Sequence, residues 1–406
     1  MADTKNNSPN ENRAAARAAA LARLVLISRR FGGDSAWVLA GGGNTSWKTA
    51  DRLYVKASGF ALGSIDESGF CEMDRARLDA IWEKTYPADS AAREKEALAD
   101  LMAARVPGET KRPSVETLLH GFFPQAFVVH THPAIVNGLT CGQGGEAAFR
   151  RLFGDEGIWV PLVDPGYILA KTVSGIFAEF KSKKGRAPAF MFMQNHGLLV
   201  AGESPEEVEA LSDSIIAKLK AEIAGRRPSA GAAANAEPDE RAVAADLAAD
   251  AGAVAGFQAA LGALAGADAA ILHRADRMIV GFAASAAAFA PLSQPFSPDH
   301  IVYAGHEYLR VDEVEDLADA WADYLKRNGK APRIVLAKNI GAFAIGQGSR
   351  EAAAQAASRA LELFVDSCKV AIYSLAFGGP RPMSPESVAF IRNWEVESYR
   401  SSIAAR

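Results

Sequence analysis

Three histidines and one glutamate fall in short segments of this 406-residue chain where they could share one metal ion: His130, His132, His196 and Glu116. Imidazole nitrogens and carboxylate oxygens are donors that zinc and other divalent transition metals accept in proteins. An HxH pair alone is more often two ordinary, partly exposed histidines than a metal site. The third histidine and the glutamate, each at the edge of an expected element, favour a metal-centred enzyme.

The HxH pair lies at the end of an expected strand. Residues 127–131 are apolar and partly β-branched, which predicts a buried strand. Because side chains alternate across a strand, His130 and His132 are expected on the same face, close enough to share an ion. Pro133 cannot donate to a strand ladder, so the strand is expected to stop there.

His196 and Glu116 have comparable positions. Residues 189–193 predict another apolar strand, which turns at its end beside His196. Ser114 is the expected cap of a helix that has Glu116 in its first turn. A glutamate there is by default a surface residue that complements the helix dipole. The sharper interpretation points it into the metal pocket, as a ligand or as a general acid/base, and makes His120 a core histidine on the same helix face.

Two turns rich in small residues could hold an anion. Residues 39–46 contain three consecutive glycines followed by Asn-Thr-Ser, and residues 57–59 form a second turn of this kind. Glycine lets the backbone approach an anion closely, and amide and hydroxyl side chains add donors. A Gly-rich turn between two strands is the commoner explanation of each. Together with Ser114, the two turns could surround one phosphate group.

These segments together resemble the class II aldolase/adducin family over about residues 15–225. The motifs that carry the resemblance, in chain order, are Gly42-Gly43-Asn44-Thr45-Ser46, Lys56-Ala57-Ser58-Gly59, Pro113-Ser114-Val115-Glu116, His130-Thr131-His132-Pro133, Pro165-Gly166 and Asn195-His196-Gly197. Residues 113–120, 164–171 and 390–400 look closest to one branch, the aldolase portion of bifunctional rhamnulose-1-phosphate aldolase/short-chain dehydrogenases.

The resemblance implies a fold and a site. The fold is α/β and three-layered, with a central, mainly antiparallel sheet flanked by helices. The metal, Zn²⁺ or another divalent transition metal, would be held by His130, His132 and His196, with Glu116 as a ligand and as the catalytic acid/base. Tyr167 is a candidate second proton donor, with packing as its alternative role. Phosphate contacts are implied for Gly43, Asn44, Ser58, Gly59 and Ser114.

The resemblance also implies an activity, the reversible retro-aldol cleavage of a ketose 1-phosphate to dihydroxyacetone phosphate and an aldehyde. Family members that act on sugar phosphates often have a serine at the position of Val115, so this chain lacks one hydroxyl for the anion. A sugar-phosphate epimerase with the same metal site is an alternative, although the related epimerases typically have aspartate in place of Glu116. A non-catalytic, adducin-like interaction protein is a third possibility, for which the ligand set should be eroded. Family sites often lie at subunit interfaces, which implies a homo-oligomer.

Composition agrees with a cytoplasmic enzyme acting on a small molecule. Hydrophobic residues make up 49% of the chain, enough for sizeable cores, and the net charge of −4 predicts neither nucleic acid nor an anionic membrane as a partner. The three cysteines are widely spaced, as in proteins of a reducing compartment. Residues 1–12 are polar and are expected to be a disordered tail without a signal peptide.

The length predicts two domains. We expect the aldolase-like domain at residues 13–225, a linker at 226–240 rich in small residues, and a second domain at 241–406. Residues 339–346 parallel 195–202, and 298–306 faintly echo 124–132, which suggests a degenerate, metal-free second copy with Ile340 and Ala304 in place of metal histidines. Chance similarity between two such units is an alternative of equal weight. Gly346-Gln347-Gly348 lacks the third glycine of a dinucleotide fingerprint and predicts no cofactor.

Overall fold

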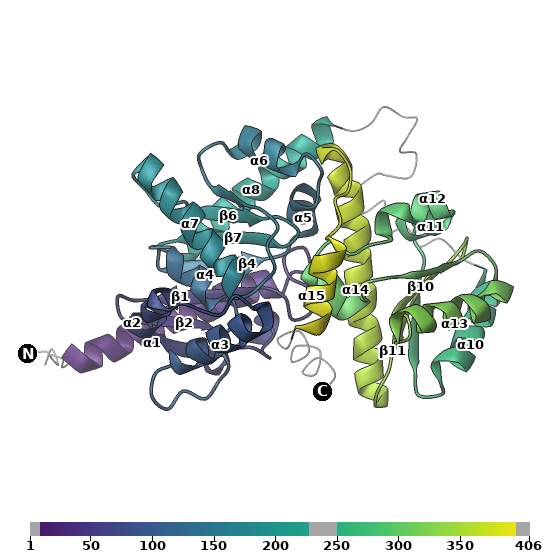
Figure 1. The fold of residues 1–406 in the computed structure, drawn as a ribbon, viewed down its shortest axis with the longest axis horizontal. Coiled ribbons are helices and arrows are strands. Elements are labelled where there is room, and N and C mark those ends of the chain that lie inside the picture. Colours follow the sequence, from purple (N-terminus) through teal and green to yellow (C-terminus); the bar gives the residue numbers. More distant parts are fainter. Residues whose placement is uncertain (1–8, 227–249, 395–406) are drawn as a thin grey trace, which may run out of the picture. The chain divides into compact units, whose positions relative to one another are not determined.

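The structure, a computed structural model, describes residues 9–226 and 250–394 (Figure 1). It contains a sheet of seven strands and a sheet of four, with helices around them. This confirms the expected α/β class with a central sheet flanked by helices. Of the predicted tail, residues 9–12 already belong to helix α1 (Pro9–Gly32) and the rest lie outside the described residues, as does all of the predicted linker except Arg226.

The seven-stranded sheet contains or adjoins the segments that carry the candidate site residues. Its pairings β1–β2, β2–β3 and β1–β4 are antiparallel. Every residue of β4 is buried, as the apolar run at 127–131 predicts, and Pro133 follows it as the N-cap of the next helix. The strand order is β3 (Phe70–Asp74), β2 (Arg52–Lys56), β1 (Asn44–Lys48), β4 (Phe127–Thr131), β7 (Gly197–Gly202), β6 (Phe190–Met193) and β5 (Ile158–Val160).

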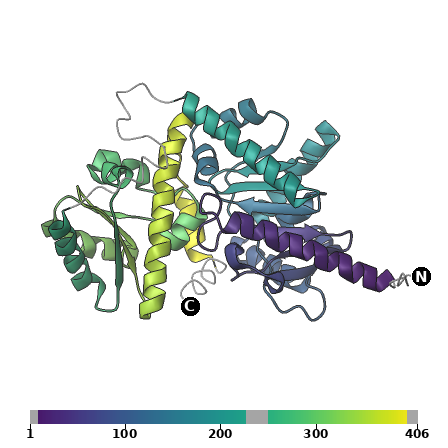
Figure 2. The same cartoon turned by 180° about the vertical axis from the view of Figure 1, so that it is seen from behind.

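The helices of this half begin and end at residues with clear physical roles. Asp74 and Asp89 each accept a backbone N–H at a helix N-terminus, and Gly185 ends another helix in a left-handed conformation. Helix α1 packs on β1 and β4 (Figure 2). No helix of the described residues is both long enough and apolar enough to span a membrane. The others are α2 (Arg75–Ala80), α3 (Ser90–Ala103), α4 (Thr117–Phe122), α5 (Ala134–Thr140), α6 (Gly145–Phe153), α7 (Tyr167–Lys184) and α8 (Pro205–Gly225).

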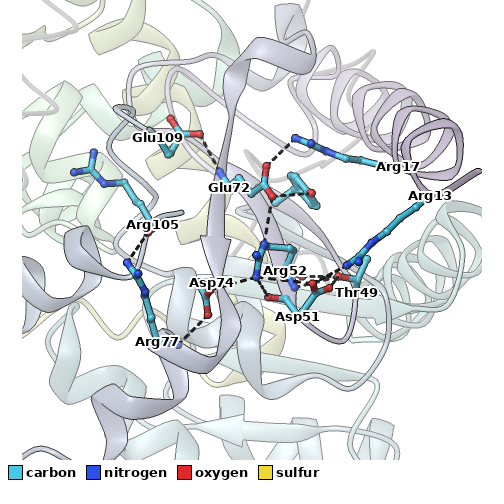
Figure 3. A network of polar contacts seen from close by, with 11 residues as sticks. Arg13, Arg17, Thr49, Asp51, Arg52, Glu72, Asp74, Arg77, Arg105 and Glu109 are labelled. Carbon is cyan, nitrogen blue, oxygen red and sulfur yellow. Dashed lines mark hydrogen bonds and ion pairs between the residues drawn. The ribbon is translucent and has the colours of Figure 1, made fainter. Parts of the chain in front are cut away.

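A polar network joins α1 to strands β2 and β3 (Figure 3). The Arg17 guanidinium donates to Glu72 at 2.7 Å, and the Arg52 guanidinium contacts Asp74 at 3.2 Å. Arg17 also lies 5.0 Å from the centre of the Tyr54 ring. Such solvent-accessible ion pairs contribute at most about 1 kcal/mol each. The network therefore fixes the direction of α1 more than it stabilises the fold.

The four-stranded sheet is built from the second half of the chain. Its order is β8 (Ala270–Arg274), β11 (Gly341–Gly346), β10 (Ile334–Ala337) and β9 (Leu309–Val311), with β9 parallel to β10 and the other pairings antiparallel. Phe257, Trp321 and Phe343 belong to the apolar core on this sheet. The helices are α10 (Ala251–Ala265), α11 (Arg277–Ala283), α12 (Ala286–Phe289), α13 (Leu317–Asn328), α14 (Arg350–Ser374) and α15 (Pro385–Asn393).

The second sheet repeats a strand order of the first. Strands β4-β7-β6-β5 and β8-β11-β10-β9 both place the first, fourth, third and second strands of a run side by side. In both runs, two helices follow the first strand, one follows the second, and a long helix follows the fourth. The turns between the last two strands match as well, since Asn195 and Asn339 have φ angles of 54° and 61°.

One expected correspondence is wrong. Residues 298–306 do not repeat the strand of residues 124–132, because His300–Ala304 forms a π-helical turn. A short apolar run such as Ile301-Val302 fits a buried helical turn as well as a strand, so its pattern could not decide between them. By place in the sheet, the counterpart of β4 is β8, and the counterpart of its histidine at the fourth position is His273.

The chain divides into two compact units. Unit 1 contains residues up to 131, 165–191 and 199–214, and unit 2 contains residues 132–164, 192–198 and those from 215 onward. The residues expected to form one domain, 13–225, are therefore shared between the two units. Unit 2 includes His132 and His196 together with the four-stranded sheet.

Candidate metal centre

His130, His132 and His196 lie together. Each offers one ring nitrogen, and the three nitrogens lie within 4.8 Å of one another. Nitrogens bound to one zinc ion at about 2.1 Å are at most ~4.2 Å apart, so an ion would draw these rings only slightly closer. His130 is fully buried, and the His132 and His196 ring centres are 5.3 Å apart. The donor set and its spacing fit a divalent transition metal.

Two local features of the chain position these histidines. His130 lies inside β4, where it pairs with Asn44 of β1, and His132 follows the end of that strand. His196 lies in the turn between β6 and β7, after Asn195 in a left-handed conformation. Asparagine tolerates this conformation better than most residues, which is why a tight turn can follow an apolar strand here.

Glu116 adjoins the histidines. Its Oε1 lies 3.3 Å from His130 Nε2, and its side chain is 12% exposed. The helix begins later than expected: Glu116 is the N-cap of α4, whose first residue is Thr117, whereas Ser114 was the expected cap. The Ser114 hydroxyl instead accepts the backbone N–H of Glu116 at 3.2 Å. The Glu116 carboxylate makes no cap hydrogen bond and is directed to His130 and Asn44.

A buried hydrogen-bonded chain runs away from Glu116. The Asn44 amide donates to Glu116 Oε2 at 2.6 Å, and Asn44 Oδ1 contacts His120 Nε2. His120 Nδ1 in turn contacts the Ser46 hydroxyl at 2.7 Å. Since the Asn44 oxygen can only accept, His120 carries its proton on Nε2 and accepts from Ser46 through Nδ1.

His120 is neutral in this chain. It is fully buried, and this burial, reinforced by the nearby His130 and Lys48, lowers its pKa to about 3. The interpretation of His120 as a core histidine is therefore incomplete, because the ring links Ser46 to the residue that holds Glu116. Sequence reasoning missed this link. The only signal was that Asn44 and Ser46, two apart on a strand, share a face.

The small-residue turn at 57–59 lies beside Ser114. An isolated bridge pairs Ala57 with Pro113 and so brings Ser58 next to Ser114. The Ser58 backbone N–H donates to Arg112 O at 2.8 Å, and its hydroxyl donates to Pro113 O at 3.2 Å. Gly59 has a φ of 94°, which favours glycine. The structure thus brings Ser58, Gly59 and Ser114 together beside Glu116.

Gly43 and Asn44 have roles that the anion prediction did not include. Gly43 has a φ of 67°, and a Cβ added there would lie 2.7 Å from the His130 carbonyl oxygen. Glycine is thus required for the chain to pass β4. The Asn44 side chain is buried and bonded to both Glu116 and His120. Its amide therefore contacts the Glu116 carboxylate.

Tyr167 is held by packing. Its ring centre lies 4.5 Å from that of Tyr86 and 6.0 Å from that of Trp82, and its backbone N–H donates to Glu94 at 2.7 Å. Burial, with Glu94 nearby, raises the pKa of its hydroxyl. These contacts agree with the alternative, structural role, and Tyr167 has no part in the chemistry proposed below.

Comparison with known proteins finds that the part of the chain that carries these residues is similar to one family. Residues 22–216 match the family model described as the class II aldolase and adducin N-terminal domain. This chain is 30% identical to the uncharacterized oxidoreductase YuxG of Bacillus subtilis (strain 168) over 212 residues. The matched region is 50% of this chain and 29% of that relative's length.

Two solved structures are similar over about half of the chain. One is the N-terminal class II aldolase domain of a conserved protein from Thermoplasma acidophilum, with 29% identity, a TM-score of 0.42 and coverage of 54% of this chain and 96% of that one. The other is L-fuculose-1-phosphate aldolase from Thermus thermophilus, with 14% identity, a TM-score of 0.36 and coverage of 52% and 96%.

Proposed function

We propose that this chain is a metal-dependent aldolase, because residues 22–216 match the family model of the class II aldolase and adducin N-terminal domain. Its substrate would be a ketose 1-phosphate of the rhamnulose 1-phosphate kind, cleaved reversibly to dihydroxyacetone phosphate and an aldehyde. The observation that supports this most is the cluster of His130, His132 and His196 with the Glu116 carboxylate 3.3 Å from His130. An intact ligand set beside an acid/base group favours an enzyme over a non-catalytic, adducin-like interaction protein.

The three histidines would hold the metal, with zinc as the proposed ion, and Glu116 lies where it could join them. A divalent cation in such a site supplies Lewis-acid polarisation of a ketone oxygen, on which negative charge develops as the carbon–carbon bond breaks. Histidine binds metals through a neutral ring nitrogen.

Glu116 would move the proton. In the cleavage direction its carboxylate takes the proton of the C4 hydroxyl while the C3–C4 bond breaks and the aldehyde leaves. The electron pair of that bond remains on the ketone fragment, and Glu116 returns a proton to C3. Asn44 holds Oε2 of this carboxylate, so Oε1 keeps its direction toward the histidines.

Ser58, Gly59 and Ser114 would bind the phosphate group of the substrate. Two hydroxyls and the backbone of a glycine turn are donors of the kind that phosphate oxygens accept. Val115 adds no hydroxyl, so we expect phosphate to contribute less binding energy than in a site with a second serine. The same chemistry without a phosphate requirement would show as equal cleavage of the unphosphorylated ketose.

Glu116→Gln tests the proposed mechanism directly, because it keeps the size and the Asn44 contact but removes the base. We expect the rate of dihydroxyacetone phosphate release to fall roughly 10²–10⁴-fold, as for loss of a general base. Glu109→Gln, at a carboxylate bonded to Lys111, is the matched control and should keep its activity. Undiminished cleavage by Glu116→Gln with its metal in place would overturn the mechanism.

We also propose that residues 251–374 are a second, metal-free copy of residues 117–225. The shared strand order and the matching Asn195 and Asn339 turns support this. By position, His273, Ala275 and Ile340 stand for the three metal histidines. They lie close together, since a Cβ added at Gly341 would be 3.0 Å from both Ala275 Cβ and His273 Nε2, and His273 Nε2 is 3.0 Å from Ile340 O.

A further inference from the structure

Asp299 contacts one of the proposed metal ligands. Its Oδ2 lies 2.6 Å from His132 Nδ1, and it is 5% exposed. Both residues belong to unit 2. Asp299 lies outside the segment that matches the family model, residues 22–216, so the family resemblance gives it no role.

The segment that carries Asp299 is fixed on several sides. The Phe296 carbonyl accepts from the Asn195 amide at 2.9 Å, in the turn that precedes His196. Met383 donates its backbone N–H to the Pro295 carbonyl at 2.9 Å. His300 Nε2, one residue after Asp299, contacts Asp366 Oδ2 at 2.9 Å. The same short segment therefore contacts both His132 and the turn that carries His196.

We propose that Asp299 is a positioning residue of the metal centre, which orients His132 and sets its tautomer. This rests on the proposed function insofar as a metal binds at all. An ionised carboxylate only accepts, so His132 must donate through Nδ1–H. The proton on Nδ1 leaves Nε2 as the nitrogen with a lone pair for the metal, and the buried contact fixes the ring plane.

The second half of the chain is on this view part of the catalytic centre. Having no complete ligand set of its own, it contributes the carboxylate that holds a ligand of the first copy. Carboxylate partners of metal-bound histidines raise the basicity of the ring and reduce the freedom it loses on binding. Their removal typically weakens metal binding by about 10- to 100-fold.

The tautomer of His132 tests the proposal in the metal-free protein. Long-range ¹H–¹⁵N spectra of the ¹⁵N-histidine-labelled chain, with His132→Gln to assign the signal, report which ring nitrogen carries the proton. We expect Nδ1–H in the wild type and a shift toward Nε2–H in Asp299→Ala. A wild-type His132 with its proton on Nε2 would overturn the proposal whether or not the protein binds metal.

Metal affinity gives the second readout. Zn²⁺ and Co²⁺ dissociation constants, measured by competition with a chromophoric chelator, should rise about 10- to 100-fold in Asp299→Ala. Asp299→Asn should lose less, because its amide oxygen can still accept from Nδ1–H. Asp366→Asn removes the charge from the neighbouring buried pair with His300 and so weakens it without touching His132, and this variant should bind both metals as the wild type does.

Two results would contradict this role. Equal affinity in Asp299→Ala and the wild type would show that the contact only packs the fold. An equal loss in Asp366→Asn would show that any loosening of the segment weakens the site. Absence of metal from the wild type would instead contradict the proposed function, and the tautomer would still decide the role of Asp299.

Discussion

The Asn44 amide donates to Glu116 Oε2 at 2.6 Å, which joins the first residue of β1 to the residue before α4. The contact connects the proposed acid/base to a chain of buried groups that ends at Ser46. The three residues of this chain of buried groups, Asn44, His120 and Ser46, bind neither metal nor substrate in the proposed reaction. The orientation of the Glu116 carboxylate should therefore be lost in variants of this chain of groups that still bind the metal.

Asn44→Ala should uncouple acid–base function from metal binding. Without the amide, Glu116 can rotate away from the histidines, and we expect kcat to fall roughly 10- to 100-fold, less than for loss of the general base itself. Metal content should be unchanged. Ser46→Ala, at the far end of the chain, is the control and should cost less than Asn44→Ala. Full activity in Asn44→Ala would refute the holding role of this amide.

Acid should destabilise the protein through His120. Burial, then His130 and Lys48, lower its pKa from 6.5 to about 3, so the folded state binds fewer protons than the unfolded state between these values. The stabilisation is complete above pH 6.5 and is lost as the pH falls toward 3. From pH 7.5 to 5.0 this group should account for a loss of about 2 kcal/mol. Urea unfolding of the wild type and His120→Gln at both pH values measures it, and equal losses in the two proteins would contradict it.

Gly43→Ala should cost more than its backbone conformation explains. Gly43 and Gly185 have almost the same φ, 67° and 66°, but a Cβ at Gly43 would lie 2.7 Å from the His130 carbonyl, while nothing lies within 4 Å of one at Gly185. Gly185→Ala should lose about 1 kcal/mol of unfolding free energy, and Gly43→Ala an additional 1–3 kcal/mol, roughly, with weaker metal binding. Denaturant unfolding of both variants checks this, and similar losses would argue against close passage of β4.

The second copy should accept a metal when its missing ligands are restored. Ala275→His together with Ile340→His supplies imidazoles beside His273 at the positions of His132 and His196. We expect the double variant to bind one more equivalent of Zn²⁺ than its parent, with Ala275→His alone as the control. A folded double variant with no added metal would contradict the correspondence of these positions.

The sequence predicts the strand that carries His130, because the signals for this strand are local. The apolar, β-branched run at 127–131 forms β4 with its predicted bounds, and the alternation of a strand fixes where His130 and His132 project. The start of α4 was misplaced. Ser114 has the usual chemistry of a cap, but the chain turns through Val115 and Glu116 before helical geometry begins at Thr117.

The remaining features depend on partners distant in the sequence. Asp299 lies 167 residues from His132, and it precedes a π-helical turn, His300–Ala304, that no sequence periodicity indicates. His120 and Asn44 are 76 residues apart, so their contact follows from the pairing of β1 with β4 and from the place of α4. The proposed repeat is indicated in the sequence by the matching Asn195 and Asn339 turns. Its first strand is not, because β8 shares only a histidine with β4.

Metal content and cleavage measured on the same preparations test the central claim most directly. Mass spectrometry of the purified wild type and His130→Ala would be combined with an assay for dihydroxyacetone phosphate released from rhamnulose 1-phosphate. We predict one divalent transition metal ion per wild-type chain, its loss in the variant, and release of dihydroxyacetone phosphate by the wild type alone. Bound metal without cleavage would contradict the aldolase assignment and favour an epimerase, and a metal-free wild type would contradict the metal centre itself.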